Sequence, residues 1–210
     1  MSLKNLSAKT KIPKVFKNKL HNKKISQIYK KFAKSLKINE NFIVAVSGGP
    51  DSLALAFLSK IYSIQKNVKV KFYIIDHKLR AESTNEAKYV KKILNKFQIN
   101  TEILRWHGKK PTNNIQSLAR MKRFEFLFSK CKKFGITKIL LGHHQEDLFE
   151  NFFIRILRGS GLKGLISFGE KTKLNNVTIL RPLINQKKED LVFISKKVFN
   201  FYVKDPTNDD

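Results

Sequence analysis

Apolar segments of strand length alternate along this chain with longer segments of helical periodicity, and this alternation limits the fold more than any other feature. The expected strands lie at residues 42–47, 68–76, 101–106, 136–142 and 177–183. The expected helices lie at residues 25–36, 53–64, 82–97, 115–134, 145–157 and 187–198. Strands that alternate with helices form a parallel sheet with helices on both faces. We therefore expect an α/β fold with a parallel five-stranded sheet sandwiched by helices.

The length of 210 residues favours one domain with a short appendage. Residues 1–40 hold twelve lysines and one acidic residue, Glu40, and the first part of this segment shows no clear periodicity. We expect residues 1–24 to form a loose basic N-terminal arm and residues 25–210 to form the folded domain.

The polar and unusual residues of the chain fall where the expected strands end. These positions carry SGGPDS at 47–52, DHKLR at 76–80, GHH at 142–144 and RP at 181–182. Open parallel sheets bind their ligands at the carboxyl ends of the strands, so one site built from these segments is expected.

The loop SGGPDS joins the first strand of the sheet to the next helix and has the properties of a phosphate cradle. Gly48 and Gly49 allow the backbone to approach an anion, and the helix that follows offers free N–H groups. Pro50 suits the first helical turn, where its missing N–H costs little. Ser47 and Ser52 add hydroxyl donors.

Asp51 stands out in this loop because a carboxylate repels a phosphate unless a cation lies between them. We therefore interpret Asp51 as a Mg²⁺ ligand. The structural alternative is a Gly-Gly turn in which Asp51 only caps the helix. The loop lacks the lysine of the common P-loop, which argues against transfer of a γ-phosphate.

Several motifs carry a resemblance to a known family. SGGPDS resembles the SGGxDS loop of the PP-loop ATP pyrophosphatases, which cleave ATP between its α and β phosphates and adenylate a substrate. Four further stretches resemble motifs of the tRNA(Ile)-lysidine synthases: IDHKLRAES (75–83), LARMKRFEFL (118–127), the long block 142–165, and RPLI (181–184) with DPTN (205–208). The resemblance extends from Phe42 to the last residue. Phe124 and Glu146 depart from the tyrosine and aspartate of the family pattern.

The resemblance implies an enzyme that joins lysine to C2 of the wobble cytidine of the isoleucine tRNA with a CAU anticodon. ATP adenylates the base, pyrophosphate leaves, and the lysine ε-amine then displaces AMP. The implied cofactors are ATP and Mg²⁺, and the implied partners are that tRNA and free L-lysine in the cytoplasm. No membrane and no stable protein partner are expected. Because the chain ends two residues after DPTN, we expect the family's C-terminal tRNA-binding domains to be absent from it.

The resemblance also implies which residues form each part of the site. The expected ATP-binding residues are Ser47, Gly48, Gly49, Pro50, Asp51, Ser52, Asp76, His77, Arg80 and His143. Asp147 and Glu150 lie three apart on one helix face and are expected to bind the cationic lysine. The alternative is an acidic first turn favoured by the helix dipole. Asp51 and Asp147 are the expected catalytic residues, and Asp147 is a possible base for the lysine amine.

The arginines point to RNA contacts. Arg155, Arg158 and Lys163 lie in a glycine-rich basic segment that could hold tRNA phosphates or the flipped cytidine. Arg120 and Arg123 are one helical turn apart and could face phosphate or RNA. The alternatives are a solvated basic loop for the first group and surface ion pairs for the second.

The net charge of +27 favours a polyanionic partner, although the scarcity of arginine, with seven among 43 basic residues, is also what an AT-biased genome produces. The single cysteine, Cys131, excludes an internal disulfide and argues against the tRNA-thiolating enzymes of the same superfamily. We expect Cys131 and Trp106 to lie in the core, and we do not expect the pair His143 and His144 to bind zinc. A non-catalytic RNA-binding module, truncated or degenerate, stays open as an alternative of a different class.

Overall fold

The computed structural model describes residues 12–107, 115–144, 169–174 and 176–203, and every structural statement below concerns those residues. They form one six-stranded sheet with the strand order β3-β2-β1-β4-β6-β5. The strands are β1 (Phe42–Val46), β2 (Val70–Asp76), β3 (Thr101–Arg105), β4 (Lys138–Leu140), β5 (Lys171–Leu174) and β6 (Val177–Leu180). The α/β class and five parallel strands are confirmed.

The sixth strand corrects the expected count. Strand β5 pairs antiparallel with β6 at the edge of the sheet, with Leu174 opposite Val177. Its sequence, KTKL, is mostly exposed and polar, so it shows none of the apolar character by which the other strands were predicted. Charged side chains on an edge strand are common because they discourage pairing with another chain.

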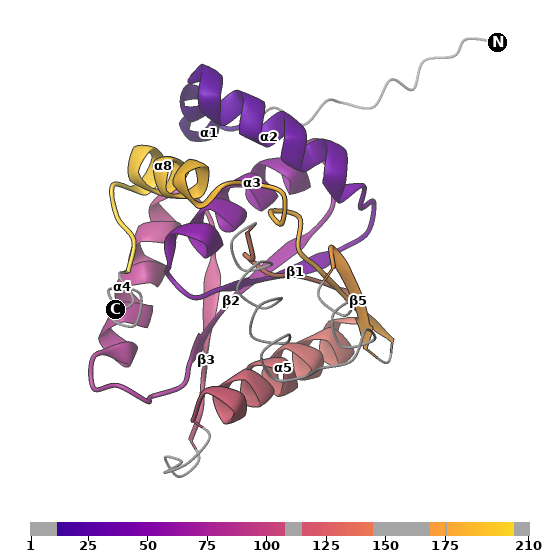
Figure 1. The fold of residues 1–210 in the computed structure, drawn as a ribbon, viewed down its shortest axis with the longest axis vertical. Helices are drawn as coiled ribbons and strands as arrows, with labels where there is room; N and C mark the ends of the chain where they lie inside the picture. Colours follow the sequence, from indigo (N-terminus) through magenta and orange to yellow (C-terminus); the bar gives the residue numbers. More distant parts are fainter. Residues whose placement is uncertain (1–11, 108–114, 145–168, 175, 204–210) are drawn as a thin grey trace, which may run out of the picture.

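Helices cover both faces of the sheet, as expected (Figure 1). They are α1 (Lys14–Leu20), α2 (Lys23–Leu36), α3 (Pro50–Lys66), α4 (Ser83–Lys96), α5 (Ile115–Phe134) and α8 (Lys188–Phe199). The side chains of β1 alternate between the two faces. Val44 and Val46 join the core under α3, α4 and α8, whereas Ile43 and Ala45 join the core under α5. The helix expected at 145–157 lies outside the described residues.

Helix α1 corrects the boundary of the expected basic arm. Phe16 is fully buried and its ring lies 5.8 Å from that of Phe57 in α3, so the segment from Lys14 onward is part of the folded domain. A seven-residue helix with one buried side chain is too short to produce a periodic pattern, which is why the sequence did not reveal it. Residues 1–11 of that arm lie outside the described part.

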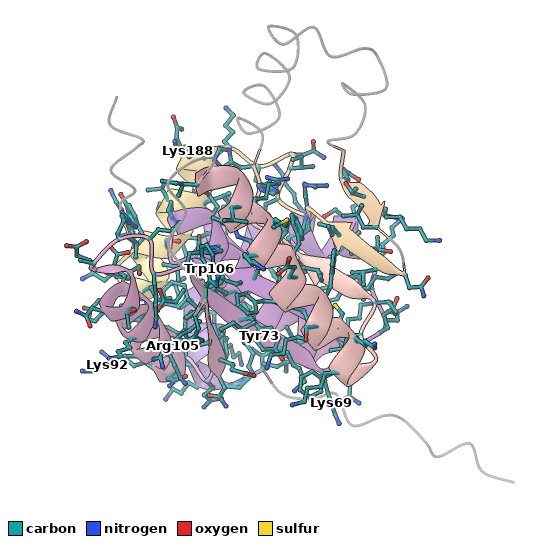
Figure 2. All side chains as sticks on the ribbon, turned by 90° about the horizontal axis from the view of Figure 1, so that it is seen from below. Lys69, Tyr73, Lys92, Arg105, Trp106 and Lys188 are labelled. Atoms are coloured by element: carbon teal, nitrogen blue, oxygen red, sulfur yellow. The ribbon has the colours of Figure 1, made fainter. Side chains whose placement is uncertain are left out.

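The two residues expected in the core differ in outcome. Cys131, a residue of α5, is buried as expected, whereas Trp106 is only half-buried after the end of β3 (Figure 2). The labelled lysines of Figure 2, Lys69, Lys92 and Lys188, lie at the periphery of the molecule. None of the helices described here combines the length and the apolar character that a membrane span requires.

Candidate active site

The turn between β1 and α3 is organised by one hydroxyl group. The Oγ of Ser52 accepts hydrogen bonds from the backbone N–H of Ser47 and of Gly48, both at 3.1 Å. It also accepts from the Ser47 hydroxyl at 3.1 Å and donates to the carbonyl of Gly49 at 3.0 Å. Ser52 therefore fixes the curvature of the loop. The single hydroxyl hydrogen of Ser52 is donated to the Gly49 carbonyl, so in this structure its side chain shapes the cradle and is not directed at a phosphate.

Gly48 occupies a position that favours glycine in two ways. Its φ of +96° lies in the region that favours glycine. A Cβ there would lie 2.8 Å from the Cγ2 of Val90 and 2.9 Å from that of Val203. The backbone N–H of Val203 donates to the Gly48 carbonyl at 3.0 Å, so the segment after α8 closes one side of the loop.

The start of α3 lies at the carboxyl end of β1. Gly49 is the N-cap residue without a side-chain cap, and Pro50 is the first helical residue. The helix therefore presents backbone N–H groups and the positive end of its dipole to the loop, as an anion site requires. The hydroxyl of Ser195 in α8 donates to the Pro50 carbonyl at 2.7 Å and ties this turn to the core.

Asp51 lies in the first turn of α3, with its side chain 22% exposed, and its Oδ2 is 3.7 Å from the Nε2 of His144. His144 is itself buried. A Cβ at Gly142 would lie within 3.1 Å of the Asp51 backbone, so the glycine at the end of β4 allows this close approach.

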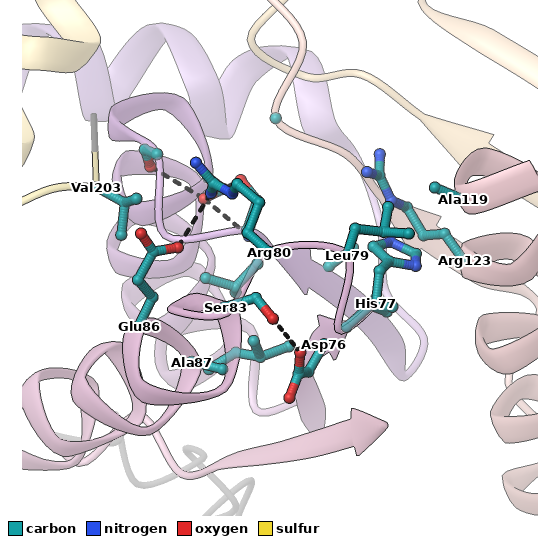
Figure 3. A pocket seen from close by; sticks show the side chains of 18 of the residues that line it. Asp76, His77, Leu79, Arg80, Ser83, Glu86, Ala87, Ala119, Arg123 and Val203 are labelled. Carbon is teal, nitrogen blue, oxygen red and sulfur yellow. Dashed lines mark hydrogen bonds and ion pairs between the residues drawn. The ribbon is translucent and has the colours of Figure 1, made fainter. Parts of the chain in front are cut away.

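A cavity of about 540 Å³ opens at this edge of the sheet (Figure 3). Its wall includes Ser47, Gly49 and Ser52 from the loop and Arg123 from α5. At the end of β2 and in the turn after it, Asp76, His77, Leu79 and Arg80 also line it. The loop after β1, the turn after β2 and Gly142 after β4 thus meet around one space, whereas His143, His144 and the Arg-Pro pair after β6 are not among the residues that line it. A cavity of this size accommodates a nucleotide-sized ligand.

Asp76 is held by its own neighbours. Its carboxylate accepts hydrogen bonds from the Thr84 hydroxyl at 2.7 Å, the Ser83 hydroxyl at 2.9 Å and the Lys78 N–H at 3.0 Å. Burial opposes ionisation of this carboxyl, but these bonds outweigh that effect and its pKa lies below the usual value. Asp76 therefore stabilises the turn between β2 and α4 at the cavity wall.

His77 and Arg80 follow in the same turn. Both ring nitrogens of His77 are buried and have no hydrogen-bond partner among the described residues. Burial and the nearby charge of Arg123 lower the His77 pKa to about 4, against the opposing effect of Asp76, so the ring is neutral at pH 7. Figure 3 shows His77 beside Arg123, on the far side of the turn from Arg80. The guanidinium of Arg80 pairs with Glu86 at 3.1 Å and is half-exposed.

A group of arginines and one histidine lies next to Arg123 of the cavity wall. Arg181, 3% exposed, donates from Nε to the Nδ1 of His143 at 3.2 Å. Burial and Arg120 lower the Arg181 pKa, and the same two causes lower that of Arg123. Arg120 itself is exposed, with its guanidinium 5.6 Å from the ring of Phe124.

Arg181 is the residue that sequence reasoning left out of the site. Its position at the carboxyl end of β6 was noted as part of the Arg-Pro pair, and that position was the available signal. A strand end alone does not distinguish a buried arginine from a solvated one, because burial depends on residues from elsewhere in the chain, here His143, Gly169 and Thr172.

The oxygen donors near the loop fit Mg²⁺ bound through a nucleotide. Mg²⁺ is usually held by one or two carboxylates together with substrate phosphates. Asp51 supplies one carboxylate beside the cradle, and the described residues contain no cluster of three or more histidines, cysteines or acids that would hold a metal alone.

The remaining expected site residues cannot be placed. Asp147, Glu150, Arg155, Arg158 and Lys163 all lie in the segment 145–168, outside the described residues.

Comparisons with known proteins agree with this geometry. The chain is 42% identical over 170 residues to the tRNA(Ile)-lysidine synthase of Orientia tsutsugamushi, covering 81% of this chain and 38% of that protein. It is 33% identical over 177 residues to the tRNA(Ile)-lysidine synthase of Bradyrhizobium diazoefficiens, covering 83% of this chain and 49% of that protein. The chain thus spans less than half the length of either relative.

A solved structure shares the fold. The U34-tRNA thiolase NcsA from Methanococcus maripaludis, solved with its 4Fe–4S cluster, superposes with a TM-score of 0.74 at 20% identity, over 87% of this chain and 67% of that one. A family model described as the PP-loop domain, and named for ATP binding, matches residues 18–210. With the glycine cradle between β1 and α3, this match shows that the chain belongs to the PP-loop domain family.

Proposed function

We propose that this chain is the catalytic domain of a tRNA(Ile)-lysidine synthase. It uses ATP to adenylate C2 of the wobble cytidine in the isoleucine tRNA with a CAU anticodon, releasing pyrophosphate. The ε-amine of lysine then displaces AMP and forms lysidine. The single observation that carries the nucleotide half of this proposal is the loop 47–52, in which Ser52 shapes a glycine turn at a helix N-terminus.

The described residues support the nucleotide site as follows. The backbone N–H groups at the start of α3 offer donors to the phosphates that leave as pyrophosphate, and Ser47 lines the same cavity. Asp51 would hold Mg²⁺, which offsets the negative charge of the phosphates when it is bound. His77 and Arg80 line the same cavity, and they and His143 are proposed to contact the nucleotide.

The proposed lysine and tRNA sites rest on the resemblance of the motifs to those of the tRNA(Ile)-lysidine synthases. Asp147 and Glu150 are proposed to bind the ammonium of lysine, with Asp147 as base for the attacking amine. Arg155, Arg158 and Lys163 are proposed to bind tRNA, together with Arg123, which lines the cavity, and Arg120, one turn away in the same helix. A cationic wall beside a phosphate cradle is suited to hold an RNA substrate next to ATP.

Thiolation of tRNA is the rival activity that the structural neighbour raises, and Cys131 argues against it. This cysteine, the single one in the chain, is 2% exposed, and burial raises its pKa to about 11. A thiol that stays protonated and inaccessible is a poor nucleophile and a poor cluster ligand.

The decisive experiment supplies the protein with ATP, Mg²⁺, labelled lysine and the CAU-anticodon isoleucine tRNA. We expect label to enter the tRNA, and pyrophosphate to be released only when the tRNA is present. A protein that binds this tRNA tightly but never turns over ATP would instead be a non-catalytic RNA-binding module.

A matched pair of variants tests the cradle itself. Ser52→Ala removes the hydroxyl that joins two loop N–H groups to the Gly49 carbonyl, and we expect at least tenfold weaker ATP binding. Ser59→Ala removes a buried hydroxyl of the same helix that has no partner among the described residues, and it should bind ATP as the parent does. Equal ATP affinities for the two variants, measured by calorimetry, would refute the cradle.

A further inference from the structure

We propose that Arg181 is a positioning residue that holds His143 as the neutral imidazole with its proton on Nε2 and that, at the nucleotide site proposed above, this proton would be donated to a phosphate oxygen. The identity of the ligand rests on the proposed function. The tautomer does not, because it follows from the protein's own contacts.

The sheet brings these two residues together. Strands β4 and β6 are adjacent and parallel, with Leu140 opposite Leu180, so the residues after both strands reach the same edge. The Nε of Arg181 lies 3.2 Å from the Nδ1 of His143. A guanidinium has donors only, so Nδ1 must accept and cannot carry a proton. A neutral imidazole with a bare Nδ1 has its proton on Nε2.

Arg181 is rigid enough to impose this choice. It is 3% exposed, and its Nη1 donates to the Gly169 carbonyl at 3.0 Å and to the Thr172 hydroxyl at 2.8 Å. Thr172 lies in β5 and Gly169 lies just before that strand, whereas His143 follows β4. The guanidinium is thus fixed between two segments, which orients its Nε–H.

The surrounding charges keep His143 neutral. Burial is the main cause that lowers its pKa to about 3, followed by Arg181 from β6, Arg120 and Arg123 from α5, and the adjacent His144. At pH 7 the ring neither gains nor loses a proton, so it can donate a hydrogen bond but not serve as an acid or base.

This state suits a ligand rich in phosphate oxygens. Such oxygens accept hydrogen bonds only, so a ring nitrogen that still carried a lone pair would repel them. The same arginines that keep His143 neutral also attract the anion.

The tautomer can be measured in the ligand-free protein by ¹⁵N NMR with labelled histidine. His143→Gln identifies the signal by its loss. We expect the Nε2–H pattern for His143, unchanged between pH 7.5 and pH 5. In Arg181→Gln we expect a population with the proton on Nδ1, or proton uptake in that pH range. Arg105→Gln, at an exposed arginine at the end of β3, should leave the pattern unchanged.

A second pair of variants keeps the charge of Arg181. Thr172→Val removes one anchor of the guanidinium and should shift the tautomer balance less than Arg181→Gln does. Thr178→Val, at a threonine of β6 whose hydroxyl instead contacts Lys138, should have no effect. A parent protein with the proton on Nδ1, or with a charged ring at pH 7, overturns the proposal even if Arg181→Gln does not fold. So does an Arg181→Gln spectrum identical to that of the parent.

Addition of ATP with Mg²⁺ tests the donor role. We expect the Nε2 signal of His143 to move together with the backbone amide signal of Gly48. Movement of Gly48 alone overturns the donor role while the nucleotide site survives. If neither signal moves, the proposed nucleotide site fails and the donor role falls with it, whereas the tautomer is still decided by the ligand-free spectrum.

Discussion

At the scale of single residues, the nucleotide loop depends on the absence of a side chain at Gly48. Gly48→Ala would place a methyl group within 2.9 Å of Val90 and Val203 and would force an L residue to a φ of +96°. We expect a loss of about 2–4 kcal/mol in the free energy of unfolding, measured by urea denaturation, together with loss of ATP binding.

Gly135→Ala is the matched control for that change. Gly135 also has a positive φ, of +62°, but a Cβ there would meet nothing within 4 Å. Gly135→Ala should lower the free energy of unfolding only by the backbone strain, which is about 1–2 kcal/mol. If the two variants lose the same stability, the close contacts with Val90 and Val203 are not what requires glycine at position 48.

The His77 ring makes a prediction about pH. Its folded pKa of about 4 lies below the usual value of about 6.5, so the fold favours the neutral ring. Above pH 6.5 both states are neutral and the ring has no effect on the pH dependence. As the pH falls from 6.5 towards 4, His77 takes up a proton in the unfolded chain but stays neutral in the folded chain. The free energy of unfolding therefore decreases over this range.

His77→Gln should therefore reduce the loss of stability between pH 6.5 and pH 4. Urea titrations at several values in this range measure the difference. His107→Gln, at an exposed histidine, serves as the control and should follow the parent protein. An unchanged pH slope in His77→Gln would contradict the burial of a neutral ring at this position.

At the scale of elements, the short helix α1 belongs to the core although its sequence gives little sign of it. Phe16→Ala removes a fully buried ring that packs against Phe57, and we expect a loss of about 3–5 kcal/mol. Phe134→Ala, at a ring that is 37% exposed at the end of α5, should cost less than half as much. Thermal unfolding measures the stability that each variant loses. Equal losses would contradict the burial of the Phe16 ring in the core.

At the scale of the whole molecule, the charge of +27 predicts a strong salt dependence of tRNA binding. Each phosphate contact releases counterions, so the affinity should fall steeply and linearly on a log–log plot against salt. Arg120→Gln and Arg123→Gln should each reduce the slope by about one, because they remove contacts beside the cavity.

Lys69→Gln provides the comparison for those arginines. Lys69 is exposed just before β2, at the amino-terminal end of that strand, whereas the cavity lies at the carboxyl ends of the strands. Lys69 carries the same charge as the two arginines, but Lys69→Gln should leave the slope of tRNA affinity against salt unchanged. Equal effects at Lys69 and Arg123 would mean that RNA responds to total charge and not to this wall.

The order of strands and helices, the α/β class and the loop 47–52 were determined by the sequence itself. The reason is that periodicity and glycine placement are local properties: the apolar runs of β1 and β2 and the turn at Gly48 and Gly49 need no distant partner to be recognised. Most expected helices and strands lie within a few residues of their predicted ends.

The tertiary structure decided everything that depends on what surrounds a side chain. Strand β5 exists because β6 lies beside it, and Phe16 is buried because α3 passes beneath it. The bond from Arg181 to His143 joins positions 38 residues apart that meet only when β4 and β6 pair. Burial and charge around an atom are sums over neighbours from the whole chain, and a pattern within one segment does not contain them.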